Sequence, residues 1–352
     1  MAINEKLIVQ EAAAPATDAD PNIMLDLNAG DVDSYDGDGD VWYDIHDFEF
    51  KPTTNVSEHF NTVTYTGNDG INEITGVGFQ PDLVWIKRRN SSTYNHVIRD
   101  SVRGTDSVLS SNTSSAETVA SNRFEFLTDG FKHLAGTQGA NNSAGTYVAW
   151  CFKAGGAAVS NTDGTRNSSV SVNTDLGFSI AKYNGNATSG ATVGHGLGVN
   201  PELIIVKNLD TAVSWGVWAT GIGLTEVLRL DQTAAATTPA TAYFTPQNNT
   251  GSVFGLGTNN ETNDGSDDYI AYCFASKRGV SKVGSYIGNG STNNKIYTGF
   301  EPAFVMLKNT SLSNTRWIIM DNARDPNNPA YKVLSPNSNA AEDTSSSYWL
   351  LD

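Results

Sequence analysis

One ten-residue pattern occurs three times in this chain. A Gly and a Pro lead into an unbroken apolar run that ends on Lys, as in GFQPDLVWIK from Gly78, GVNPELIIVK from Gly198 and GFEPAFVMLK from Gly299. Gly and Pro interrupt the preceding structure, and consecutive apolar residues are typical of a strand that is buried on both faces. The pattern therefore predicts three equivalent core strands, at residues 83–87, 203–207 and 304–308.

The similarity extends to both sides of this pattern. Tyr65, Tyr183 and Tyr286 precede the three prolines by 16, 18 and 16 residues, and YVAWCFKA at 147–154 returns as YIAYCFAS at 269–276. The first and third copies also share an Asp-x-x-Arg segment, at 100–103 and 321–324, and a related segment at 109–118 and 334–343. Each unit spans roughly 100 residues, which is the size of a small domain.

The composition indicates an all-β fold. Gly, Ser, Thr and Asn are abundant, 17% of residues are charged, and the apolar segments contain β-branched and aromatic residues rather than helix formers. We predict tandem antiparallel β-sandwich domains, jelly-roll-like, at 61–165, 166–279 and 280–352, spaced by linkers such as 155–165. An extended arm and linker at 1–22 and a small β segment at 23–60 precede them.

The third unit has no counterpart of the segment YVAWCFKA. A sandwich without its last strand exposes a long apolar edge, which promotes aggregation. We expect either that the chain is a piece of a longer protein or that another chain supplies the strand, and we favour the longer protein.

The net charge of −16 argues against nucleic acid and anionic membranes as partners. The basic cluster Lys87, Arg88, Arg89 is interpreted as a solvated loop after a buried strand. No run of about 18 apolar residues predicts membrane insertion, and the opening segment MAINEKLIVQ lacks the features of a signal peptide. We therefore expect a protein that does not use the ordinary secretory route.

The cysteines and histidines predict no catalytic or metal site. Cys151 and Cys273 occupy equivalent positions about one domain apart, so we expect two buried, reduced thiols rather than a disulfide. The five histidines lack metal-ligand spacing, and the sequence contains neither a nucleophile elbow nor a phosphate-binding loop. Asp100 with Arg103, like its copy, predicts an intradomain salt bridge or a turn cap, because catalysis rarely needs duplicate centres. We predict no cofactor and no enzymatic activity.

An acidic segment, DVDSYDGDGDVWYDIHD, contains candidate calcium ligands. The residues at the spacing of positions 1, 3, 5 and 12 of a calcium loop are Asp36, Asp38, Asp40 and Asp47. Position 6 is Val41, where the sharp turn needs Gly, and position 12 is Asp rather than Glu. We favour a solvent-facing turn between predicted strands at 23–27 and 41–45 over a calcium site.

Several longer motifs occur in a fixed order: GFQPDLVWIKRRN from Gly78, DSVRG from Asp100, YVAWCFKAGG from Tyr147, GHGLGVNPELIIVKN from Gly194 and VGSYIGNGS from Val283. Over residues 61–352 they resemble a family of repetitive β-rich proteins of tailed, chiefly marine, bacteriophages, which are mostly described as structural, tail or tail-fibre proteins. Separately, LDLNAGDVDSYDGDGDVWYDI from Leu25 is similar to the start of concanavalin-like, laminin-G-like modules.

The resemblance implies a structural virion protein, a tail fibre or related appendage on the phage surface, synthesised in the host cytoplasm. The N-terminal arm would dock on other tail or capsid proteins, and the domains would meet a host glycan or protein receptor. We expect a homo-oligomer, a trimer, because repetition raises avidity. The residues expected to anchor the arm are Ile3, Leu7, Ile8 and Val9. The candidate glycan contacts are Trp215, Trp218, Tyr243 and Phe244.

Two alternatives stay open. A glycan-degrading tail enzyme would need a pair of carboxylates, for which Glu117 with Asp129 or Glu261 with Asp264 are the candidates. A capsid-decorating protein or head fibre would have the same sequence features as a tail protein.

Overall fold

The computed structural model divides the chain into two units, Asn4–Thr53 and a second unit that contains everything from Thr54 onward. The structure describes residues 55–134, 139–290, 294–327 and 329–344, all of which belong to the second unit. The predicted arm at 1–22 and the predicted strands at 23–27 and 41–45 lie outside the described residues.

The regular secondary structure of the described residues is almost entirely β, which confirms the predicted fold class. Repeat 1 (55–154) contains η1 (Val56–Glu58), β1 (Phe60–Thr66), β2 (Asn72–Thr75), β3 (Leu83–Arg88), β4 (Val97–Asp100), β5 (Ser107–Val108), β6 (Thr118–Val119), β7 (Phe124–Leu127), β8 (Gly130–His133) and β9 (Thr146–Phe152). Repeat 2 (155–279) contains β10 (Val159–Asn161), β11 (Ser168–Asn173), β12 (Phe178–Asn184), β13 (Thr192–Gly194), β14 (Leu203–Asn208), β15 (Gly216–Ala219), η2 (Thr220–Ile222), β16 (Leu228–Arg229), η3 (Ala240–Ala242), η4 (Pro246–Asn248), β17 (Val253–Gly255) and β18 (Asp268–Phe274). Repeat 3 (280–344) contains β19 (Phe304–Leu307) and β20 (Ile318–Asp321).

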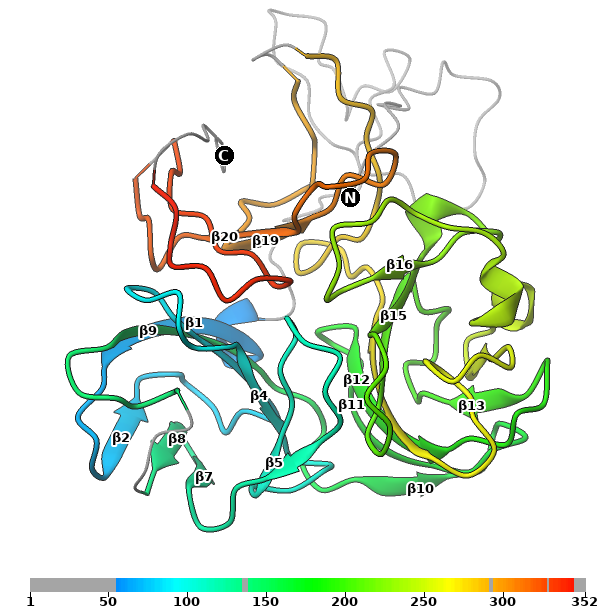
Figure 1. The fold of residues 1–352 in the computed structure, drawn as a ribbon, viewed down its shortest axis with the longest axis horizontal. Coiled ribbons are helices and arrows are strands. Elements are labelled where there is room, and N and C mark those ends of the chain that lie inside the picture. Colours follow the sequence, from blue (N-terminus) through cyan, green and yellow to red (C-terminus); the bar gives the residue numbers. More distant parts are fainter. Residues whose placement is uncertain (1–54, 135–138, 291–293, 328, 345–352) are drawn as a thin grey trace, which may run out of the picture. The chain divides into compact units, whose positions relative to one another are not determined.

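Repeats 1 and 2 each contain a central antiparallel sheet, and the two sheets have the same topology (Figure 1). The strand order β1-β9-β3-β4 in repeat 1 corresponds to β12-β18-β14-β15 in repeat 2, which adds β10, β11 and β16. The register is also the same, because Leu83 pairs with Phe152 and Leu203 pairs with Phe274. The strands predicted from the repeated pattern are β3, β14 and β19, each within one residue of its expected bounds.

The central strands are buried on both faces, as their unbroken apolar runs predict. Alternate residues of β9, such as Trp150 and Phe152, belong to a core that all three repeats share. The residues between them, Ala149 and Cys151, belong to a core within repeat 1 that the sheet β2-β8-β7 closes from the other side. This sheet-on-sheet packing agrees with a sandwich, while the jelly-roll connectivity stays a prediction.

The shared core corrects the expectation of domains spaced by linkers. Trp85 of repeat 1, Trp215 of repeat 2 and Trp317 of repeat 3 are all buried in it. The expected linker at 155–165 contains β10, which pairs with β11 and so begins repeat 2. The repeats therefore depend on one another for one face of their central sheets.

Three equivalent side-chain hydrogen bonds join the repeats in a closed ring. Each comes from the residue just before β15, β20 or β4 and ends on a backbone carbonyl of another repeat. The pairs are Trp215 Nε1 to Ser110 O (3.1 Å), Trp317 Nε1 to Arg229 O (3.0 Å) and His96 Nε2 to Ser335 O (3.0 Å). Since Trp85 Nε1 donates to His96 Nδ1, the His96 proton lies on Nε2.

Three equivalent backbone hydrogen bonds follow the same ring. They run from Glu117 N to Leu209 O (2.9 Å), from Ala236 N to Thr310 O (2.8 Å) and from Glu342 N to Arg89 O (2.8 Å). Repeat 1 thus contacts repeat 2, repeat 2 contacts repeat 3, and repeat 3 contacts repeat 1 in matching ways. The described part of the chain has internal, approximately three-fold symmetry.

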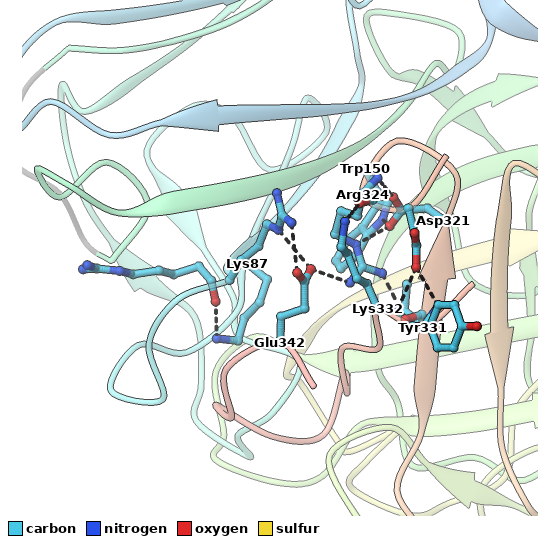
Figure 2. A network of polar contacts seen from close by, with 11 residues as sticks. Lys87, Trp150, Asp321, Arg324, Tyr331, Lys332 and Glu342 are labelled. Atoms are coloured by element: carbon cyan, nitrogen blue, oxygen red, sulfur yellow. Dashed lines mark hydrogen bonds and ion pairs between the residues drawn. The ribbon is translucent and has the colours of Figure 1, made fainter. Parts of the chain in front are cut away.

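Buried ion pairs reinforce two of the three contacts, and they confirm the predicted salt bridges. In repeat 3, Asp321 binds the fully buried Arg324 (2.6 Å) and also accepts a hydrogen bond from Trp150 Nε1 of repeat 1 (2.9 Å). Figure 2 shows how Glu342 continues this network. It accepts from Arg324 (3.0 Å) and, at 2.9 Å each, from Nε and Nη2 of Arg89. Burial favours the neutral acid, but these two guanidinium groups hold the pKa of Glu342 below its ordinary value.

The same network recurs in repeat 1. Asp100 binds Arg103 (2.5 Å) and accepts a hydrogen bond from the hydroxyl of Tyr272 in repeat 2 (2.7 Å), while Glu117 takes the place of Glu342. In repeat 2 the positions of Asp100 and Arg103 are occupied by Ala219 and Ile222, so the third contact has no ion pair of this kind.

The repeated lysines are buried, which corrects the interpretation of Lys87 to Arg89 as a solvated loop. Lys87 and Lys207 are 0% exposed, and their ammonium groups donate to backbone carbonyls at the end of the strand and in the loop after it, such as Arg88 O (2.7 Å) and Val213 O (2.9 Å). Burial lowers the pKa of each to about 8. Arg89 is also engaged, through Glu342.

Both cysteines are buried and free, as predicted. Cys151 and Cys273 pair with equivalent residues of β3 and β14 and belong to separate cores, one in repeat 1 and one in repeat 2. Burial raises the pKa of the Cys273 thiol to about 12, so neither a thiolate nor a disulfide is favoured there.

We predict that the three repeats unfold in one cooperative transition, because each exposes its share of a common core when another is lost. Tryptophan fluorescence reports on all three repeats, and far-ultraviolet circular dichroism reports on the sheets. In a urea titration the two curves should coincide. Separate transitions, as independent domains would give, contradict the shared core.

Replacing Asp321 by Ala should lower the free energy of unfolding by about 3–5 kcal/mol, because it leaves the buried Arg324 charge without its partner. Asp100→Ala should have a similar effect, since the network is repeated. The control is Arg316→Ala, which breaks a partly exposed ion pair with Asp343 and should cost about 1 kcal/mol or less. Urea denaturation measures all three variants.

Acid should weaken the ring at His96. Burial lowers the pKa of His96 to about 3, well below 6.5, so the unfolded chain binds more protons between these values and stability falls as pH drops below about 6.5. His96→Gln keeps an acceptor and a donor but does not titrate. Between pH 4 and 6 its unfolding free energy should vary with pH by about 1.4 kcal/mol per unit less than that of the parent. An unchanged pH dependence would contradict this assignment.

Candidate functional site

A concave site lies in repeat 2. It is an open cavity of about 620 Å³. Its walls come from the loop before β14, from β15, from the segment after η2 and from the loop after η4, and the side chains that define its chemistry are Val199, Glu202, Trp218, Leu224 and Asn249. A pocket of this size suits one small molecule or one sugar residue with its neighbours.

Two wall residues are fixed by their place in the repeat. Glu202 directly precedes β14 and accepts a hydrogen bond from the Ser276 backbone N–H (2.5 Å), as Asp82 does from the Ala154 N–H in repeat 1 (2.7 Å). Trp218 lies in β15 and donates its Nε1–H to Gly223 O (2.8 Å). The indole is therefore held rigidly, with one edge satisfied and 5% of the residue exposed.

The rest of the cavity is apolar at its rim and polar at one wall. Val199 and Leu224 are exposed to 42% and 54%. Asn249 accepts from the Gly255 N–H (3.0 Å), while its Nδ2, which is buried, has no partner among the described residues. The lining includes one carboxylate and no basic side chain, so neutral or cationic ligands are favoured over anions.

Of the four predicted glycan contacts, one lines this cavity. Trp218 does so, whereas Trp215 is fully buried in the shared core and Phe244 in the core of repeat 2. Tyr243 is half-buried and hydrogen-bonds Arg229 through its hydroxyl. The sequence did not single out Glu202, Leu224 or Asn249, because loops far apart in the chain bring them together. The only signal in the sequence was the position of Glu202, directly after the Pro of the repeated pattern.

Three of the four carboxylates proposed for a glycan-degrading enzyme serve other roles. Glu117 binds Arg103 (2.9 Å) and Glu261 binds Arg229 (2.8 Å). Asp129 accepts two backbone hydrogen bonds, from the N–H groups of Gly78 and Gly76, which lower its pKa. Neither of the two cavities identified is lined by more than one carboxylate.

The metal and anchoring candidates cannot be placed. Asp36, Asp38, Asp40 and Asp47 lie outside the described residues, as do Ile3, Leu7, Ile8 and Val9. Within the described ranges, no group of three or more His, Cys, Asp or Glu side chains is arranged to hold a metal ion.

A second cavity, of about 450 Å³, lies between repeats 2 and 3 and has a polar lining that includes Asp231 and Asn337.

No helix within the described residues is both long and apolar enough to span a membrane. Comparison with curated proteins gives no match, and comparison with solved structures gives none either. Residues 55–351, which include all three repeats, match the model of a family described as a domain of unknown function, DUF7483. The chain belongs to this family.

Proposed function

We propose that this chain is a non-enzymatic structural protein of a tailed bacteriophage, part of a tail fibre or related appendage on the virion surface. The observation that carries the proposal is the closed ring of equivalent contacts around one shared core. In such an arrangement the repeated charged and aromatic residues hold the three repeats rigidly together. It suits a body that presents a surface, and the resemblance of residues 61–352 to phage structural proteins supports the virion role.

In this role the N-terminal region docks on other virion proteins, and the three-repeat body faces the host. A homo-oligomer, a trimer, would multiply weak contacts with a host receptor. The cavity at Trp218 is the receptor contact that the geometry favours, because an aromatic ring, amide and carboxylate groups and an aliphatic rim are the chemistry that neutral glycans use. A place on the head rather than the tail is the alternative for the same structural role.

Location is tested by immunogold electron microscopy with antibodies against residues 55–351, on particles of a phage that encodes the chain. Labelling of the tail or its fibres is the expected result, and labelling of the head would assign the chain to a head fibre or decoration. Particles without label would overturn the virion role. Hydrolysis of host polysaccharide by the purified protein would overturn the non-enzymatic role.

The receptor contact is tested with a glycan array. Leu224→Ala and Glu202→Gln should each weaken the binding of the glycans that the parent retains by about tenfold. The first removes apolar surface at the rim of the cavity, and the second removes the charge while keeping an acceptor for the Ser276 N–H. Tyr297→Ala, at a site that is 71% exposed and not part of the cavity lining, is the matched control and should bind as the parent does. Equal loss in the control would exclude the cavity.

A further inference from the structure

Among the described residues, the strand β19 has one partner strand where its counterparts have two. In repeats 1 and 2 the repeated strand lies between a hairpin partner and a closing strand, with β3 between β4 and β9, and β14 between β15 and β18. Among the described residues, β19 pairs with β20 alone. Its other edge is therefore the edge that a closing strand covers in the other two repeats.

Backbone hydrogen bonds mark this edge. The N–H groups of Asp82 and Glu202, just before β3 and β14, donate to Phe152 O (2.8 Å) and Phe274 O (2.7 Å) of the closing strands. Ala303 is the equivalent residue before β19, and its N–H has no partner within the described ranges. The edge presents a donor that the fold elsewhere always uses.

Side-chain burial is incomplete at the same place. Leu83 and Trp85 of β3 are buried, whereas Phe304 and Met306 at the equivalent positions of β19 pack against the shared core and stay half-buried. Tyr286 occupies the place of Tyr65, yet its segment is not a strand. The strand β1, which contains Tyr65, pairs only with the closing strand β9, so without a closing strand among the described residues the segment of Tyr286 has no strand to pair with. The neighbouring Ile287 is 90% exposed. An apolar surface and an open strand edge thus occur together.

The other two repeats define what would fit. Their closing strands place large apolar residues toward the shared core and a Tyr, an Ala and a Cys toward the opposite face. At the central position, Trp150 and Tyr272 each donate to an Asp of the next repeat. A strand beside β19 would meet repeat 2, which has Ala219 and Ile222 in place of the Asp and Arg. Its central residue is therefore one without a polar hydrogen, such as Phe or Leu.

We propose that the free edge of β19 binds an extended, apolar β-strand of a partner polypeptide, with a non-polar residue at its centre. This mode of binding adds a strand to an existing sheet. Among the described residues, a second copy of the chain has no suitable strand to give, because β9 and β18 are central strands paired on both edges. A further copy of the closing strand itself fits poorly, because its indole or phenol donor would lack the acceptor. The proposal rests on the repeat geometry and not on the virion role.

The test uses the full chain and a fluorescent heptapeptide of residues 146–152 that carries Trp150→Phe and Cys151→Ala. Fluorescence anisotropy should show saturable binding, and a scrambled peptide should not bind. The peptide that keeps Trp150 should bind at least about threefold more weakly, because its indole N–H meets no acceptor. Absence of saturable binding by the Phe peptide would overturn the proposal.

Ala303→Pro removes the open N–H without removing a hydrogen bond of the described fold, and Ala303→Ser is the matched control that keeps it. The Pro variant should bind the peptide about tenfold more weakly or worse, and the Ser variant within about twofold of the parent. Equal binding by the Pro variant would place the peptide elsewhere. If the Pro variant does not fold, hydrogen exchange in the parent decides: the peptide should slow the amides of residues 303–310, and unchanged exchange there would overturn the proposal. Self-association of the parent that Ala303→Pro abolishes would assign the edge to a second copy and overturn the partner.

Discussion

The structure depends on central strands that are apolar on both faces. One face of each strand packs within its own repeat, and the other needs cover that the repeat does not contain. Trp85, Trp150 and Trp215 show the result, because each lies in the core to which all three repeats contribute. Burying a large aromatic side chain stabilises a fold by about 1.5–3 kcal/mol or more, so the repeats are more stable together than apart.

Polar groups, rather than the apolar core, determine how the repeats are oriented relative to one another. Hydrophobic contact alone would allow the repeats to slide or rotate, whereas an indole N–H buried without an acceptor is costly. Trp317 on the Arg229 carbonyl and Trp150 on the Asp321 carboxylate therefore fix how neighbouring repeats meet. At the contact between repeats 2 and 3, Ala219 and Ile222 stand in place of the Asp and Arg, so a contact of this kind forms without the buried ion pair.

The departures from symmetry coincide with the sites that carry the proposals. Repeat 1 has the buried Arg99 where repeat 2 has Trp218 beside a cavity, and it has Asp82, bonded three times, where repeat 2 has Glu202. Among the described residues, repeat 3 has no strand in the place of the closing strands β9 and β18. When one repeat departs from a residue or strand that the other repeats share, and the departure does not improve packing, a functional explanation is favoured.

The sequence by itself determined the all-β class, the three equivalent strands, the buried free thiols of Cys151 and Cys273 and the Asp–Arg pairs. Each of these follows from residue order over short distances, such as an unbroken apolar run or a spacing of three. Only the tertiary structure decided that the repeats share a core, that Lys87 is buried among carbonyls and that Trp215 is a core residue while Trp218 lines a cavity. An apolar run predicts that both faces of a strand are covered but not which residues cover them, because that partner can lie 100 or more residues away, as Trp150 and Asp321 do. For the same reason the sequence could name Trp218 as a candidate but could not bring Glu202, Leu224 and Asn249 to its side.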